Sequence, residues 1–566
     1  RQGRRPYRPR VALWLVLLVL VAALANSWMY LAACSNALDS GILAGDAFEG
    51  RRLLERDGLL AWFASHRYYP PLYFGWLALL CPAGERPSVE LLVMWSDLLV
   101  VAGLLGLACA LLRMGGKAEA AATAALLAVG SPIINQQLKV LQFECGLLGV
   151  VGLALWLLSG PRGLPGLFGA ALLGLLGGLG LLFKWTAGLY LLGPVAVATV
   201  TWFRSGGAVG AGAARLALAA VVAALIAGPW FAFVLDWDLL ATTTLNDQTP
   251  GLPQGFAAFR VQLANYAGDL PSGLGLHLSG LVAAGVAVGL LRRARGTFLF
   301  LSSAVVAIVC LACFRHWESR YLAPLIPALA AAAGAGFSTL TRPVAVAVAV
   351  VAALLSAAQV DDSTWTNLRR GSPPVTIGLH GSMDGEKRMV WTSSAVNRLH
   401  DRYKMFLGAL ARPGEPLDWA VHPVESHSAL AVHLCEFLAR TDPAPVVSWH
   451  LRGYDAPGFA SFAEQLESAP VAVLFLSENL LRIDRAEALQ LVRHGATVVD
   501  QATGSRSGRV PSEDPLLLAK LRYAYWWVET VPDPEGALWV LLRKDLVERC
   551  TNLPRLGLCI RPVPLE

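Results

Sequence analysis

Charged residues are scarce in this chain. Asp, Glu, Lys and Arg make up 15% of its 566 residues, whereas hydrophobic residues make up 55%. A soluble domain has about a quarter charged residues, so this composition indicates that lipid is the main solvent for much of the chain. The formal net charge is +6, but no basic stripe with interleaved aromatic residues occurs, which argues against a nucleic-acid partner.

The chain also lacks the local motifs of several enzyme classes. Its polar C-terminal part contains no glycine-rich phosphate loop, no metal-ligand signature and no nucleophile elbow. Cysteine is sparse, with nine residues, and most of these lie in or beside apolar runs, where a thiol behaves as a small hydrophobe. Cys550 and Cys559 are the exception, and they are the pair that a disulfide would join if this part lies outside the cytoplasm.

The chain instead contains about eleven apolar runs, each near the length that crosses about 30 Å of hydrocarbon. We predict a polytopic α-helical membrane domain over residues 1–360, followed by a soluble domain over residues 361–566. The first run follows the basic segment 1–10 and is too long for a signal peptide, so we expect a retained signal anchor. The runs cover residues 11–33, 88–112, 117–134, 142–158, 164–183, 185–203, 212–235, 273–291, 297–314, 321–338 and 343–360.

The charges between these runs are sorted by side. With the N-terminus placed in the cytoplasm, the inside loops are basic and nearly free of acid, whereas the outside loops carry most of the acidic residues. Basic residues in short loops favour the cytoplasmic side of a membrane. We therefore expect a cytoplasmic N-terminus and, after an odd number of spans, a C-terminal domain outside the cytoplasm, in a bacterial cell membrane.

The segment between the first two spans, residues 34–87, is too long for a simple turn. Residues 45–57 alternate apolar and charged side chains in the pattern of an amphipathic helix, and Pro71 opens a second helix over residues 72–80. The second helix is too short to span. We expect both helices to lie flat at the outer interface, where Trp and Tyr are favoured.

After residue 359 the apolar runs become short. Residues 446–449, 471–476, 497–499 and 538–542 are predicted strands, and helical patterns cover residues 426–439, 457–467 and 486–493. Alternating strands and helices predict a small α/β layer domain. Capping of the membrane domain, binding of an acceptor and plain structural support all remain open as its role.

Three carboxylates are candidates for chemistry near the outer interface. Asp46, with Asp39 as the competing choice, lies in the acidic first loop and would act as a general base on an acceptor hydroxyl or amine. Asp46 alternatively caps the amphipathic helix that it opens. Glu144, close to Gln142 at the start of a span, would complete an acidic or metal site with Asp46, or else be a polar helix end that reaches water.

Cations form the second candidate group, because ionisable residues at membrane depth are costly and tend to be functional. Lys184 lies between two spans on the expected outer side, where it would meet an anion or simply snorkel. Arg315, Glu318 and Arg320 precede the segment Tyr321 to Pro327. An arginine there can hold a phosphate bidentately, or it pairs with Glu318. Tyr69, Pro70, Pro71 and Tyr73 form a stiff loop before the interfacial helix.

In their order these features resemble the GT-C superfamily of polyprenyl-phosphate-sugar-dependent glycosyltransferases, which includes protein O-mannosyltransferases and the aminoarabinose transferase acting on lipid A. The resemblance extends from the first span to about Ala333. It rests on the acidic loop with Asp46, the segment Pro70-Pro71-Leu72, Lys184, Pro229-Trp230, and Arg320-Tyr321 through Pro327. The family has an adjacent Asp-Glu in its first loop and commonly an Asp later, whereas here Ala47 follows Asp46 and the later acid is Glu144.

The resemblance implies a membrane glycosyltransferase that moves a sugar from a polyprenyl phosphate to a protein, lipid or glycan with inversion. Lys184, Arg320, Tyr321 and Arg315 would bind the donor phosphate, while the loop of Tyr69 to Tyr73 and Glu318 would border the substrate. No nucleotide cofactor is implied, and a divalent metal stays open. A lipid-linked sugar transporter or flippase and a non-catalytic scaffold of the same fold are the alternatives.

Overall fold

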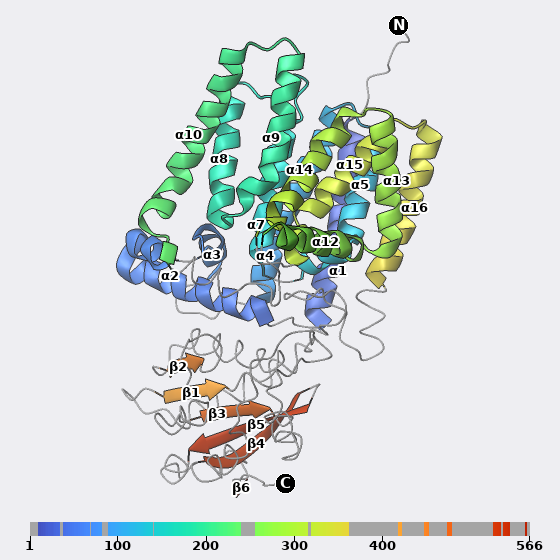
Figure 1. Ribbon diagram of the computed structural model, residues 1–566. Helices are drawn as coiled ribbons and strands as arrows, with labels where there is room; N and C mark the ends of the chain where they lie inside the picture. Colours follow the sequence, from blue (N-terminus) through green and yellow to red (C-terminus); the bar gives the residue numbers. More distant parts are fainter. Residues whose placement is uncertain are drawn as a thin grey trace. The chain divides into compact units, whose positions relative to one another are not determined.

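The computed structural model describes residues 9–33, 38–67, 69–81, 89–139, 141–238, 255–314 and 319–361, together with the backbone of six strands further along the chain. The chain divides into two compact units. One comprises Arg1–Ala32, Gly50–Cys81 and Glu90–Lys387, and the other comprises Ala33–Glu49, Pro82–Val89 and Arg388–Glu566. The first is a unit of helices, and the described strands all belong to the second (Figure 1).

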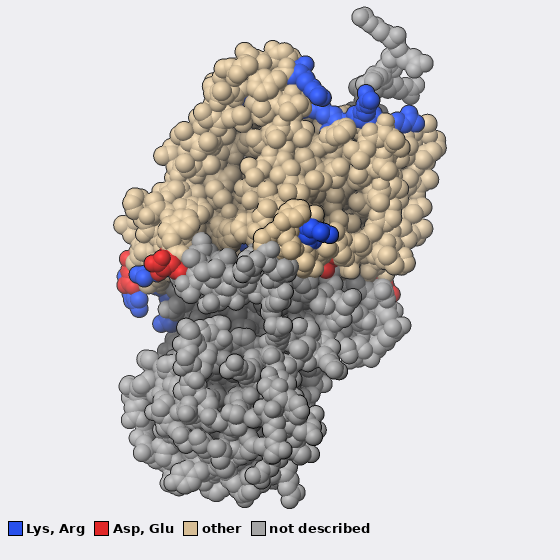
Figure 2. Space-filling model, in the orientation of Figure 1, with Lys and Arg blue, Asp and Glu red and all other residues tan. Residues whose placement is uncertain are grey.

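Each of the eleven predicted spans overlaps a helix. By length and composition, five helices in the described part of the chain could cross a membrane, or six if the bent pair α12 and α13 counts as one span, and four shorter helical stretches are also apolar. Figure 2 shows a broad uncharged surface on the helical unit, with Lys and Arg at its upper end and charges of both signs toward its lower edge. The helices are α1 (Pro9–Ala33), α4 (Val89–Arg113), α5 (Ala118–Gly130), α7 (Phe143–Leu158), α8 (Leu167–Phe183), α9 (Ala187–Arg204), α10 (Val209–Phe233), α13 (Leu276–Leu291), α14 (Arg295–Ala312), α15 (Leu325–Phe337) and α16 (Arg342–Val360).

Glycine allows the central helices to approach closely. A Cβ atom on Gly103 of α4 would collide with the carbonyl of Leu148 in α7, and one on Gly152 of α7 would collide with the backbone of Gly103. The two helices therefore touch backbone to backbone. Gly174 and Gly178 of α8 face α10 in the same way. Small residues at such crossings are the usual means of packing helices in lipid, where no hydrophobic force brings them together.

Four helices lie outside the predicted spans or divide them: α2 (Leu38–Ser65), α3 (Leu72–Ala78), α6 (Pro132–Gln137) and α12 (Phe256–Leu274). The amphipathic helix predicted over 45–57 lies within α2 and ends before Gly58, whose positive φ of 85° breaks the helical path. The expectation that Asp46 caps this helix is wrong, because α2 already begins at Leu38. Between α12 and α13 the chain bends by 107° at Gly275.

The C-terminal end of α10 contacts the loop that joins α2 to α3. Trp230 is fully buried, and its Nε1 donates to the carbonyl of His66 at 2.8 Å. Phe63 and Leu72 pack against the same apolar cluster. The Pro229-Trp230 pair is thus a structural anchor, and it fixes the polypeptide on either side of Tyr69 and Pro70.

The strands of the second unit form one mixed sheet in the order β2-β1-β3-β5-β4-β6. The three strands β2, β1 and β3 run parallel, whereas β5 and β4 add antiparallel to β3 and β6 pairs antiparallel with β4. Three predicted strands match β2, β3 and β5; the predicted strand 497–499, the three predicted helices and both cysteines lie outside the described residues. The strands are β1 (Leu417–Val421), β2 (Val447–Leu451), β3 (Val473–Ser477), β4 (Tyr525–Asp533), β5 (Gly536–Arg543) and β6 (Arg561–Pro562).

Candidate functional site

Glu144 lies in the first turn of α7 and is completely buried. The expectation that it is a polar helix end reaching water is therefore wrong. An acidic residue in the first helical turn interacts favourably with the free N–H groups and the dipole of the helix. That local interaction does not repay the burial of a full charge, so the carboxylate needs a cationic partner.

Lys184 provides that partner. It forms the corner between α8 and α9, where an extended backbone with φ −157° ends α8 and turns the side chain inward. Its Nζ lies 2.5 Å from Oε1 of Glu144, and the residue is only 6% exposed. The alternative expectation, that the Lys184 side chain extends to water at the membrane surface, is therefore wrong. It is a buried cation held by a buried acid.

Arg320 approaches the same carboxylate from a third direction. It lies in the short 3-10 helix η1 (Ser319–Leu322), and its Nε lies 3.7 Å from Oε1 of Glu144. The ring of Tyr321 lies 4.3 Å from Lys184 Nζ, which adds a cation–π contact. The hydroxyl of Tyr190 donates to the carbonyl of Tyr321 at 3.0 Å and so ties η1 to α9.

The cluster of Glu144, Lys184, Arg320 and Tyr321, hereafter the cationic cluster, joins α7, the α8–α9 corner and η1. Oε1 of Glu144 faces both cations, whereas its Oε2 is buried without a hydrogen-bond partner. Thr186 Oγ1, two residues from Lys184, is another buried oxygen without a partner. Buried polar atoms are normally hydrogen-bonded, so an orphaned carboxylate oxygen beside two cations points to a functional site.

The proline loop packs onto the start of α7. The ring of Tyr69 stacks on Phe143 with centroids 5.0 Å apart, and the buried ring of Tyr73 packs against Phe143 at 5.2 Å. The Tyr73 hydroxyl hydrogen-bonds Ser96 Oγ at 2.9 Å, and Pro70 and Pro71 are both buried. Because Phe143 directly precedes Glu144, this loop lies next to the cationic cluster.

The other predicted site residues are not placed. The side chains of Asp39 and Asp46, and the residues Arg315 and Glu318, lie outside the described part of the chain. The alternative pairing of Arg320 with Glu318 is therefore untested. Among the described residues, no three His, Cys, Asp or Glu side chains gather where they could hold a metal ion.

The structure contains a second buried acid that the sequence reasoning missed. Asp97 of α4 is 1% exposed, Ser27 Oγ lies 3.5 Å from its Oδ2, and its Oδ1 has no hydrogen-bond partner. The available signal was the position of an acid within the apolar run 88–112, since such residues are expensive in a membrane.

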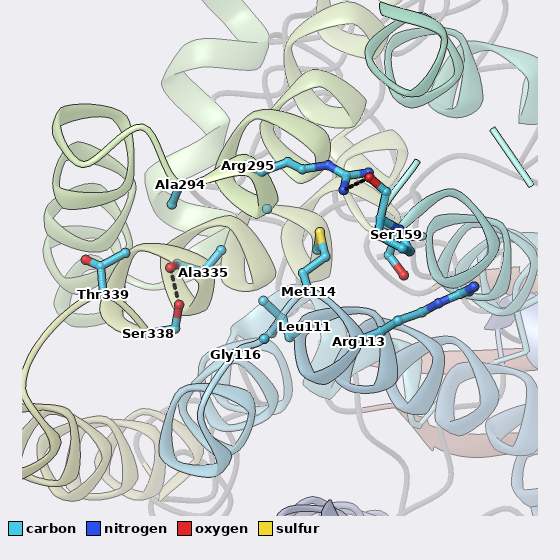
Figure 3. Close-up of a pocket in the computed structure, with 13 residues that line it drawn as sticks. Leu111, Arg113, Met114, Gly116, Ser159, Ala294, Arg295, Ala335, Ser338 and Thr339 are labelled. Carbon is cyan, nitrogen blue, oxygen red and sulfur yellow. Dashed lines mark hydrogen bonds between the residues drawn. The ribbon is translucent and has the colours of Figure 1, made fainter. Parts of the chain in front are cut away.

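A cavity of about 400 Å³ lies at the opposite end of α7, among residues that include Arg113, Ser159, Arg295 and Ser338 (Figure 3). Fifteen residues separate Glu144 from Ser159, which is roughly 22 Å at 1.5 Å per residue. Figure 3 shows the guanidinium of Arg295 and the hydroxyl of Ser338 each bonded to a backbone carbonyl, those of Pro161 and Ala335. None of the predicted site residues lines this cavity, and the cationic cluster is the better candidate.

Solved structures share this fold at low sequence identity. ArnT from Cupriavidus metallidurans in the apo state matches with a TM-score of 0.55 and 14% identity over 94% of this chain and 98% of that one. The same protein bound to undecaprenyl phosphate matches with a TM-score of 0.53 and 16% identity over the same shares. No family model and no curated protein sequence matches the chain. The chain thus shares the overall fold of ArnT.

Proposed function

We propose that the chain is a membrane glycosyltransferase that transfers a sugar from a polyprenyl-phosphate carrier to an acceptor on the extracytoplasmic side. The single observation that carries this proposal is the cationic cluster, in which Lys184 and Arg320, 136 residues apart in sequence, meet at one buried carboxylate. The fold supports it, because ArnT of this fold was solved with undecaprenyl phosphate bound.

Lys184 and Arg320 are suited to hold the donor phosphate. A phosphodiester carries one negative charge, and a lysine ammonium and an arginine guanidinium both form short charge-assisted hydrogen bonds with phosphate oxygens. Low exposure strengthens these interactions, because buried charges are screened less than exposed ones. The ring of Tyr321 steers Lys184 and would face the same headgroup.

The transfer itself needs a base and a leaving group. Asp46, with Asp39 as the competing choice, takes the proton from the acceptor oxygen or nitrogen as this atom attacks the anomeric carbon. The bond between that carbon and the phosphate oxygen breaks, and the bonding electrons stay with the phosphate. Lys184 and Arg320 neutralise the charge that develops there, an electrostatic contribution of the oxyanion-hole type. Attack opposite to the leaving group inverts the anomeric centre.

The described contacts support one orientation in a bacterial inner membrane. Arg113, Lys117, Arg295 and Arg342 gather at the end of the bundle where α7 terminates, whereas the cationic cluster lies at the other end. Basic loops favour the cytoplasm, so the cluster and the C-terminal unit belong to the extracytoplasmic side and the N-terminus to the cytoplasm.

A transfer assay tests this function. The full chain in lipid nanodiscs is given a panel of radiolabelled polyprenyl-phosphate sugars and an extract of envelope acceptors, and label in the acceptor fraction is measured. We expect transfer with one donor, and a loss of about a hundred- to ten-thousandfold on Asp46→Asn or Asp39→Asn, whichever is the base. The control is Glu119→Gln at the opposite end of the bundle. Movement of the intact donor across a vesicle membrane without bond cleavage would show a flippase instead. No change of label in any fraction would favour a non-catalytic scaffold of the same fold.

A further inference from the structure

Glu144 places a carboxylate inside the site that is proposed above to bind an anion. Its Oε1 lies 2.5 Å from Lys184 Nζ and 3.7 Å from Arg320 Nε, the two groups assigned above to the donor phosphate. Its Oε2 has no hydrogen-bond partner. A bound phosphate would therefore compete with this carboxylate for the same cations.

Stability does not explain this arrangement. A buried ion pair is often no more stabilising than apolar residues of the same volume. A buried acceptor without a hydrogen bond also costs free energy. The free energy of burying the Glu144 carboxylate is not recovered by folding. We therefore look for its role in the binding of ligands.

The two ligands of the proposed reaction differ in charge. The donor is a phosphodiester with one negative charge. When the bond to the anomeric carbon breaks, the phosphate keeps the oxygen and becomes a monoester, which carries about 1.5 to 2 negative charges at pH 7. Without the charge of Glu144, the two cations would hold this spent carrier more tightly, and the product would leave the site more slowly.

We propose that Glu144 is a specificity-determining residue, which sets the charge of the phosphate site so that it accepts the sugar-linked phosphodiester and releases the spent monoester. This inference rests on the proposed function. Coulomb repulsion is proportional to the charge of the ligand, so a fixed carboxylate penalises a dianion about twice as much, in free energy, as a monoanion. Glu144 therefore weakens binding of both lipids, and of the monoester more.

The test compares two probes that differ by one charge. Undecaprenyl phosphate and its methyl phosphodiester are titrated at pH 8 into nanodiscs that contain the wild-type chain or Glu144→Gln, and dissociation constants are measured by calorimetry. If the diester tightens about threefold in the variant, doubling the free-energy change predicts about tenfold for the monoester. Glu119→Gln, which removes a carboxylate paired with Arg342, is the matched control and should change neither constant.

In a folded Glu144→Gln protein, the inference would be overturned if both lipids tightened equally, or if their affinity stayed unchanged or weakened. The proposed function would stay intact in these cases, provided that Lys184→Met still abolishes binding of both probes. A wild-type protein that binds neither probe would overturn both. Glu144→Met removes the same charge with an apolar side chain and is measured beside Glu144→Gln. In either folded variant, equal tightening of both lipids would overturn the inference.

Discussion

The two ends of helix α7 use their cations differently. At the C-terminal end, Arg113 donates to the carbonyl of Trp156, and Arg295 donates to the carbonyls of Gly160 and Pro161. At the N-terminal end, Lys184 and Arg320 meet the carboxylate of Glu144.

This difference separates cations that stabilise the fold from cations that are candidates to bind a ligand. The last carbonyls of a helix have no partner within it, and cations near that end satisfy them and the helix dipole. Arg113 satisfies a carbonyl of the last turn of α7 and Arg295 those of the loop that follows, so the fold accounts for both arginines. A helix N-terminus favours anions, and the buried carboxylate of Glu144 needs one cationic partner; the second cation is what a phosphate ligand would explain.

The largest expected effect comes from breaking the buried pair. Lys184→Met leaves Glu144 as a buried charge without its closest partner, and we expect a loss of about 3 kcal/mol in the free energy of unfolding. Arg342→Met breaks the Glu119–Arg342 pair, whose arginine is exposed, and should cost less than about 1 kcal/mol. Thermal unfolding in detergent measures both. The double variant Lys184→Met/Glu144→Gln should recover most of the loss; a double variant as unstable as the single one would contradict a buried charge pair.

A second prediction concerns the close contact between helices α4 and α7. Gly103→Val in α4 forces a side chain against the backbone of α7, and overpacking of this kind costs about 1–3 kcal/mol. Gly188→Ala in α9 is the matched control, because no atom lies within 4 Å of the added Cβ. The melting temperature should fall for the first variant and stay level or rise for the second. Equal melting temperatures would argue against a backbone-to-backbone contact.

A smaller effect is expected where Trp230 holds the loop beside the cluster. Trp230→Phe removes the hydrogen bond to the buried carbonyl of His66 and should cost about 1 kcal/mol, since an acceptor is left without its donor. Trp237→Phe removes a bond made by an exposed indole and serves as control. Limited proteolysis between α2 and α3 should become faster only in the first variant, and equal cleavage rates would show that Trp230 does not hold the loop.

The smallest effect concerns pH. Burial lowers the pKa of His66 below its ordinary value, partly opposed by its hydrogen bond to the carbonyl of Trp62. The folded state then binds fewer protons than the unfolded state, so this contribution to stability is present above a pH of about 6.5 and is lost as the pH falls from there through the lowered pKa of the folded state. His66→Phe should reduce the decline of melting temperature between pH 7.5 and pH 5. A variant with the same decline would assign it to other groups.

The membrane helices could be predicted from the sequence because hydropathy is a local property. Helix α12 was missed because Arg260, Asp269 and Pro271 interrupt its apolar pattern. The pairing of Glu144 with Lys184 was also missed, because 40 residues separate them and only the packing of α7 against α8 brings them together. The sequence indicated each as a costly charge at membrane depth, but a local pattern cannot state which charges meet.

In the sheet the missed strands were the less regular ones. β1 includes Asp418 in a run of five residues, and β4 is broken by a register shift between Trp527 and Glu529. The change from parallel to antiparallel pairing at β5 depends on connections that a single sequence does not specify.

A cryo-EM map of the full chain with undecaprenyl phosphate bound tests the central claim most directly. We expect the phosphate within hydrogen-bonding distance of Lys184 Nζ and the guanidinium of Arg320, at the N-terminal end of α7. A phosphate bound instead at Arg113 and Arg295, or at neither end of that helix, would contradict it.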